Sequence, residues 1–195
     1  PSMEKLMKEN ILACKEKFFD KEFEVVFHHS LDRKKFKLDY KSSPRHVIKH
    51  NKFADWLESE GIRYVDISGS AENLINYYSN VDLHIGFRVH AHIFMNSITR
   101  KSILVSEDGR AKGVKGAIGG IVLDGYTYFK EAFMAKIFNR LFPFYDRFIA
   151  NKFLTIELLS EIDYEKVVNF NRFKGARIQI DKNYLIMHQF LMQLP

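Results

Sequence analysis

The chain alternates between short apolar runs and longer stretches whose apolar residues recur at helical spacing. Residues 81–85 form a short, mostly apolar run, which predicts a buried strand. From Arg88 onward the apolar positions follow a helical period, with Val89 and Ile93 one turn apart. Gly86 lies between the two patterns, where it permits a sharp turn of the backbone. The stretch 81–92 therefore predicts a strand, a tight turn and the start of a helix.

The same alternation continues on both sides of this central stretch. Alternating strands and helices are typical of βαβ units and a parallel sheet. We therefore predict an α/β fold, in which a Rossmann-like parallel sheet is flanked by helices. The pattern predicts strands at 23–27, 62–67, 81–85, 102–106 and 121–123, helices at 3–19, 44–60, 71–80 and from Arg88, and loops at 31–43, 107–113 and 116–120.

From Tyr126 the pattern becomes mainly helical. Aromatic and apolar residues recur at helical spacing from Phe129 to Phe148, with basic residues between them and a break at Pro143. We interpret this segment as helices that cover the sheet; the alternative is a basic, aromatic surface for a membrane or for a partner domain. The predicted organisation is a Rossmann-like domain at 1–125 and a helical C-terminal extension at 126–195 that packs on it. Within this extension the pattern predicts helices at 153–170 and 182–194 and an extended segment at 178–180.

Composition narrows the classes of partner. The 195 residues suffice for one or at most two domains, and 46% of them are hydrophobic, enough for a substantial core. The net charge of +6 favours anionic ligands, but the basic residues are dispersed, which disfavours nucleic acid. The single cysteine, Cys14, excludes an internal disulfide and fits the cytosol. No apolar run approaches the roughly 20 residues that span a bilayer. We expect a cytoplasmic protein, with the inner face of the membrane as a weaker alternative.

Polar residues cluster directly after the predicted strands. In parallel sheets, ligands bind beyond the carboxyl ends of the strands. These positions therefore outline a candidate site along one edge of the sheet. They are His28-His29, Ser68-Gly69-Ser70, Gly86 with Arg88 and His90, and Asp108 with Arg110.

Arg88 and His90 carry the most specific chemistry of these clusters. Both lie in the predicted first turn of a helix, where free N–H groups and the helix dipole attract anions. A guanidinium group fits a carboxylate or phosphate, and an imidazole transfers protons near neutral pH. Arg110 and Lys112 are candidates for further anion contacts. The alternative is a structural pair, in which Arg88 caps or bridges and His90 is hydrogen-bonded in the core.

The sequence lacks the motifs expected of a metal-dependent hydrolase and of a dinucleotide-binding loop. Among the eight histidines, only His46 and His50 have a spacing that suits a shared metal, and no acidic residue between them completes a hydrolase motif. The glycines at 116–120 precede a strand instead of opening a helix, so they do not form a dinucleotide loop. We therefore predict no metal and no cofactor.

The stretch Asp82-Leu83-His84-Ile85-Gly86-Phe87-Arg88-Val89-His90-Ala91 resembles the polysaccharide pyruvyl transferase family, whose members carry an Arg-x-His motif between a strand and a helix. The resemblance runs from about Ile62 to Gly120 and includes the next strand and Asp108-Gly109-Arg110. Val89 and Ala91 stand where the family usually has Leu and Gly. The resemblance implies one half of a two-domain GT-B fold, and because the chain has room for one half, we expect it to be the C-terminal domain, with an N-terminal domain missing.

The resemblance also implies an activity. Members of the family transfer a pyruvyl group from phosphoenolpyruvate to sugar hydroxyls of a cell-surface polysaccharide, so the expected partners are phosphoenolpyruvate and a sugar or lipid-linked oligosaccharide acceptor. Arg88 and His90 would be catalytic, with Arg88 holding the carboxylate or phosphate and His90 acting as acid or base. The expected substrate-binding residues are Gly86, Arg88, Val89, His90, Asp108 and Arg110. The alternative function is a non-catalytic domain that binds an anion or a nucleotide sugar.

Overall fold

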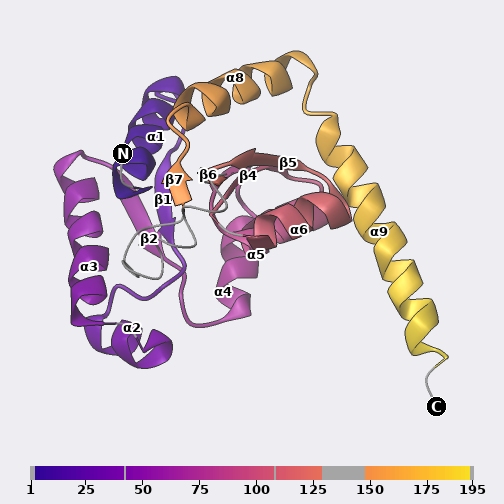
Figure 1. Cartoon of the computed structure of the whole chain (residues 1–195), viewed down its shortest axis with the longest axis horizontal. Coiled ribbons are helices and arrows are strands. Elements are labelled where there is room, and N and C mark those ends of the chain that lie inside the picture. Colours follow the sequence, from indigo (N-terminus) through magenta and orange to yellow (C-terminus); the bar gives the residue numbers. More distant parts are fainter. Residues whose placement is uncertain (1–2, 42, 108, 129–147, 194–195) are drawn as a thin grey trace, which may run out of the picture. The chain divides into compact units, whose positions relative to one another are not determined.

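A computed structural model describes residues 3–41, 43–107, 109–128 and 148–193 (Figure 1). The chain divides into two compact units: a larger unit of residues 1–14 and 82–195, and a smaller unit of residues 15–81. The predicted division at residue 125 is not the boundary between them. Residues on either side of it belong to the larger unit. There the side-chain amide of Asn151 donates to the Asp124 carbonyl (2.9 Å), and the backbone N–H of Asn151 donates to the Gly125 carbonyl (2.9 Å).

Both units contain parallel strands and helices, which confirms the predicted α/β class. The larger unit also contains one antiparallel strand pair, 126–128 with 148–150, inside the segment predicted to be mainly helical. The helix α1 (Met3–Lys17) begins in the larger unit and ends in the smaller one. The smaller unit continues with β1 (Glu24–Phe27), α2 (Arg33–Tyr40), α3 (Pro44–Ser59), β2 (Arg63–Asp66) and α4 (Ala71–Tyr78). The larger unit continues with β3 (Leu83–Gly86), α5 (Val89–Ser97), β4 (Lys101–Ser106), α6 (Gly109–Ile118), β5 (Ile121–Asp124), β6 (Tyr126–Tyr128), β7 (Phe148–Ala150), α8 (Leu154–Val167) and α9 (Arg172–Leu191).

The main sheet of the larger unit has the parallel strand order β3-β4-β5. Successive side chains of a strand point to opposite faces, so neighbouring residues of β4 pack against different helices. Leu104 packs with Ala111 of α6 on one face. Val105 packs with Leu6 of α1 and Leu154 of α8 on the other. Both faces are thus covered, as parallel sheets require.

The smaller unit pairs β1 with β2 in parallel, with Glu24 opposite Arg63 and Phe27 opposite Asp66. Its helices begin where the sequence supplies a cap. The Ser70 hydroxyl accepts from the Asn73 amide and begins α4 at residue 71, where the predicted helix starts. This sheet likewise presents the carboxyl ends of its two strands at one edge.

Helices occupy parts of all three predicted loops. The segment 31–43 contains α2, because the Asp32 carboxylate accepts from the Lys35 amide at 2.7 Å and Phe36 is fully buried. The helix α6 (Gly109–Ile118) overlaps the predicted loops 107–113 and 116–120, which were suggested by its glycines. A buried Ala111 instead holds one side of this helix against the sheet.

The C-terminal region contains two long helices. The predicted helix at 153–170 is confirmed as α8, whereas the extended segment predicted at 178–180 is wrong, because it lies within α9. There Phe173 and Ala176 are buried, and the Asn183 amide donates to the Ala117 carbonyl at 2.8 Å. The helices predicted between Phe129 and Phe148 fall largely on 129–147, outside the described residues.

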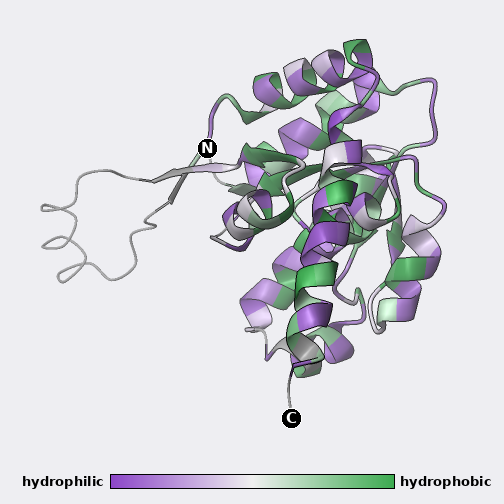
Figure 2. Ribbon diagram, turned by 90° about the vertical axis from the view of Figure 1, so that its right-hand side faces the viewer, coloured by the Kyte–Doolittle hydropathy of each residue, from purple (hydrophilic) through white to green (hydrophobic). Residues whose placement is uncertain are grey.

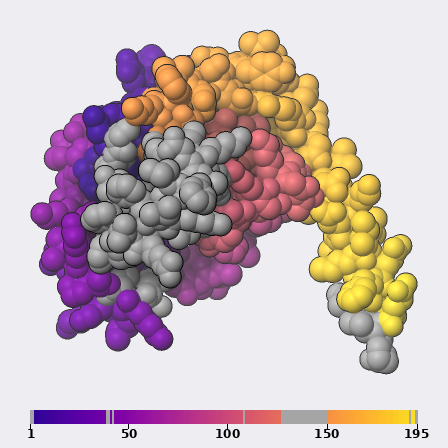
Figure 3. Space-filling model, in the orientation of Figure 1, coloured from indigo at the N-terminus to yellow at the C-terminus, as the bar shows by residue number. Residues whose placement is uncertain are grey.

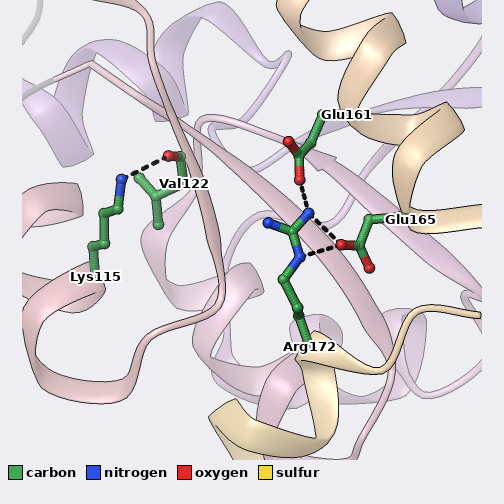
Figure 4. A network of polar contacts seen from close by, with 5 residues as sticks. All are labelled: Lys115, Val122, Glu161, Glu165 and Arg172. Atoms are coloured by element: carbon green, nitrogen blue, oxygen red, sulfur yellow. Dashed lines mark hydrogen bonds and ion pairs between the residues drawn. The ribbon is translucent and has the colours of Figure 1, made fainter. Parts of the chain in front are cut away.

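The start of α9 is tied to α8 by an ion-pair network. The Arg172 guanidinium contacts both Glu161 and the fully buried Glu165 (Figure 4). Figure 3 shows α9, in yellow, running beside α6. Hydrophilic and hydrophobic residues alternate along its ribbon in Figure 2. Within the described residues, no helix combines the length and apolarity that crossing a membrane demands.

The junction after β5 provides a test of this packing. A Cβ on Gly125 would lie 2.4 Å from the backbone oxygen of Ser106, so Gly125→Ala must displace one strand end. We expect it to lower the free energy of unfolding by roughly 1–3 kcal/mol, the usual cost of overpacking. Urea unfolding provides the measurement.

Gly113→Ala is the matched control. A Cβ on Gly113 would meet nothing within 4 Å, and the residue is solvent-exposed in the middle of α6. We expect this change to stabilise the protein by about 0.5–1 kcal/mol. Equal unfolding midpoints for Gly125→Ala and the native chain would contradict the close contact.

Candidate anion-binding site

The carboxyl ends of β3 and β4 lie side by side at one edge of the sheet of the larger unit. Gly86, the last residue of β3, pairs with Leu104 in the parallel register. The helix α5 begins three residues after Gly86, and α6 begins at Gly109, three residues after the end of β4. Two helix N-termini therefore meet this edge (Figure 1). The predicted strand, turn and helix start are confirmed.

The first turn of α5 is open. Arg88 is the N-cap residue, with extended backbone angles (φ −92°, ψ 107°) and no side-chain hydrogen bond to the helix start. By contrast, Asp32, Ser43 and Ser70 cap α2, α3 and α4 with their side chains. The His92 amide donates to the Arg88 carbonyl at 3.0 Å and closes the first turn. The amides before it have no acceptor within the helix, so they are available to an anion.

The side chains of Arg88 and His90 are not committed to structural contacts. Arg88 is half-buried and His90 is exposed. Among the described residues, neither side chain forms a hydrogen bond, an ion pair or a ring contact. The structural alternative requires Arg88 to cap or bridge and His90 to lie in the core. Within the described part of the chain, these contacts are not formed.

The remaining predicted residues have different surroundings. Val89 packs against Leu104, Ala111 and Val122, so its side chain anchors α5 to the sheet. Arg110 is exposed in the first turn of α6 and lies 4.0 Å from Glu107, at the same sheet edge. Asp108 lies outside the described residues.

Polar clusters of the smaller unit have structural contacts. The His28 Nε2 lies 2.8 Å from the Tyr78 hydroxyl, and the Asp66 carboxylate accepts from the amides of Leu31 and Ser68, both at 2.8 Å. His50 stacks on Phe36 with ring centroids 4.4 Å apart. In the described part of the chain, no three His, Cys, Asp or Glu side chains group to hold a metal ion.

A buried polar network, which the sequence pattern does not predict, underlies the candidate site. The Ser102 hydroxyl in β4 lies 2.8 Å from Nδ1 of His84 in β3 and 2.7 Å from Nδ1 of His92 in α5. Asn96, one turn beyond His92, places its amide nitrogen 3.2 Å from the His92 Nε2. All four side chains are buried. The signal in the sequence was the presence of four polar residues at core positions of otherwise apolar elements.

Compared with known protein families, with curated proteins and with solved structures, the chain matches none of them. The geometry of the site and the short motif that contains Arg88 and His90 are therefore the features that bear on function.

The His92 imidazole gives a pH-dependent test of the network. Burial lowers the pKa of His92 from 6.5 to about 4, because the charged ring loses its hydration. The unfolded chain therefore binds one more proton than the folded chain between these values. Stability should be complete above pH 6.5 and should fall as the pH drops toward 4, by about 3 kcal/mol at ~1.4 kcal/mol per pKa unit.

His92→Asn removes this titrating group. Urea unfolding measured from pH 7 to pH 4 should show a shallower loss of stability in the variant, by close to one proton per molecule. An identical pH slope in the two proteins would show that the His92 ring is not buried in its neutral form.

Proposed function

We propose that the chain is a pyruvyl transferase domain, which binds phosphoenolpyruvate at the start of α5 and transfers its pyruvyl group to sugar hydroxyls. One observation carries the proposal. Arg88 and His90 both lie at a helix start that no side chain caps, and neither side chain has a partner among the described residues. The resemblance of the motif at 82–91 to polysaccharide pyruvyl transferases supports it.

Anion recognition follows from the groups at the start of α5. Phosphoenolpyruvate carries a carboxylate and a phosphate. The Arg88 guanidinium can bind either group through two parallel hydrogen bonds. The open amides of the first turn and the helix dipole add donors and positive potential. Val89 keeps these amides in place through its contacts with the sheet.

Proton transfer is the role of His90. Its ring donates a proton to the methylene carbon of phosphoenolpyruvate, the C=C double bond becomes a methyl group, and C2 becomes an oxocarbenium centre. A sugar hydroxyl attacks C2 and releases its proton to the neutral imidazole. The C2–O bond to phosphate then breaks, a second hydroxyl attacks, and its proton passes to the phosphate. The products are a pyruvate ketal and inorganic phosphate, and no redox partner is needed.

The acceptor in this proposal is a sugar with two neighbouring hydroxyls, free or as part of a lipid-linked oligosaccharide. We propose a cytoplasmic location for the reaction, since the single cysteine fits a reducing compartment. A second domain would supply the acceptor side of the cleft in a GT-B arrangement.

Phosphoenolpyruvate binding tests the proposal. Ligand at 100 times its Kd should stabilise the native chain by roughly 2.7 kcal/mol in a thermal-shift titration. A hydrogen bond to a charged group contributes roughly 1.5–3 kcal/mol. Arg88→Gln should therefore weaken binding by about 10- to 100-fold.

Arg100→Gln is the charge-matched control. Arg100 directly precedes β4, at the amino end of the strand, and pairs with the exposed Asp82 at 3.0 Å. Its removal changes the net charge equally and should leave phosphoenolpyruvate affinity unchanged. Equal losses in the two variants would indicate general charge attraction and would contradict a site at Arg88.

The two candidate activities differ at His90. In a transferase, His90→Gln should retain phosphoenolpyruvate binding while phosphate release in the presence of acceptor sugars falls about 10²- to 10⁴-fold. Binding without phosphate release by the native chain would instead favour a non-catalytic anion-binding domain.

A further inference from the structure

The turn that carries Arg88 is enclosed by two histidines that share one hydroxyl group. His84 lies two residues before Gly86, and His92 lies two residues after His90. Both rings direct Nδ1 at the hydroxyl of Ser102, at 2.8 Å and 2.7 Å. The strand that enters the turn and the helix that leaves it are thus bound to the same atom of β4.

The contacts of Asn96 identify which atom donates and which accepts in each hydrogen bond of this network. The Asn96 Nδ2 donates to the His92 carbonyl at 2.8 Å, which fixes the orientation of the amide, and its second proton faces the His92 Nε2 at 3.2 Å. Nε2 is therefore the acceptor and Nδ1 carries the proton of the neutral His92 ring. Nδ1–H donates to Ser102, whose single proton is then free for the His84 Nδ1.

Close packing prevents the two rings from tilting away. A Cβ on Gly86 would lie 3.0 Å from the His84 Nε2, so the turn rests directly on that ring. A Cβ on Gly120, which has φ +81°, would lie 2.9 Å from the His92 Nε2. His92 and Ser102 are both fully buried, so neither can touch a ligand.

We infer that His92 and Ser102 are positioning residues for the Arg88–His90 turn. The chain of donors from His92 through Ser102 to His84 holds the end of β3 and the first turn of α5 in one arrangement, in which the amides and the Arg88 guanidinium converge on an anion. This inference rests on the proposed function for its ligand, and on the hydrogen bonds alone for its effect on the turn.

A comparison of His92→Asn with His92→Leu tests the role of the Nδ1–H donor of His92. Both replacements lose the ring and share one branched side-chain skeleton, but only Asn places an N–H group where Nδ1 stood. We expect His92→Asn to bind phosphoenolpyruvate and inorganic phosphate within about threefold of the native chain. His92→Leu should bind about 10- to 100-fold more weakly, because small misplacements of binding groups are costly. Calorimetric titration at a temperature where all variants are folded provides the measurement.

The outcomes separate the inference from the proposed function. Normal binding by His92→Leu, or equal losses in the Leu and Asn variants, would overturn the positioning role. The affinity of Arg88→Gln for phosphoenolpyruvate would still test the anion site separately. If the native chain binds neither phosphoenolpyruvate nor phosphate, the proposed function fails, and the backbone amide NMR shifts of residues 86–90 decide the inference. These shifts should move in His92→Leu and stay in place in His92→Asn; unchanged shifts in both would overturn it.

A second variant covers the case in which His92→Leu does not fold. Ser102→Ala removes one hydroxyl group and adds no volume. It should move the amide shifts of residues 86–90, whereas Ser106→Ala, a second buried serine of β4 that contacts Asp124 on the neighbouring strand, should leave them unchanged. Equal effects of the two alanine variants would overturn the inference.

Discussion

The parallel pairing of β3 with β4 is the interaction on which the candidate site depends. Its register sets Gly86 opposite Leu104 and His84 opposite Ser102. The first pair brings the starts of α5 and α6 to one edge of the sheet, and the second forms the buried network beneath that edge. A shift of one residue would turn every side chain of β3 to the other face and would separate His84 from Ser102. The same pairing thus positions both the candidate anion site and the buried network beneath it.

Three histidines within nine residues have different environments because of backbone geometry. His84 lies on a buried strand, whereas His90 and His92 are two residues apart on a helix and so point to nearly opposite sides. Burial lowers the pKa of His92 and so favours its neutral ring, whose Nδ1 lies 2.7 Å from the Ser102 hydroxyl. His90 is exposed at the start of the same helix, where a ligand can reach it. One residue type therefore serves both as internal support and as a candidate acid or base.

The sequence was most informative where a pattern was local. The apolar run before Gly86 and the change to helical spacing after Arg88 each depend on neighbouring residues, and both elements form where expected. The helix α6 was missed because its glycines suggested a loop, while its stability comes from the packing of Ala111 on the sheet. Residues 178–180 alternate like a strand, but the burial of Phe173 and Ala176 favours a helix. Neither effect is visible without the tertiary structure.

The candidate site could be located from the sequence but not completed. Arg88 and His90 were identified by their place after a strand, since that place alone predicts open amides. The contact of Ser102 with both His84 and His92 joins three elements, and no spacing along the chain reveals it. The boundary between the two units likewise reflects contacts between distant segments, including α1 with α8, and not a change in composition.

An NMR titration of the full chain with phosphoenolpyruvate, observing the backbone amides and the arginine Nε–H groups, tests most directly for an anion site at the start of α5. We expect saturable shifts of the amides of residues 86–91 and of the Arg88 Nε–H, reproduced more weakly by inorganic phosphate. Saturable shifts confined to other residues, with residues 86–91 unchanged, would contradict an anion site at the start of α5.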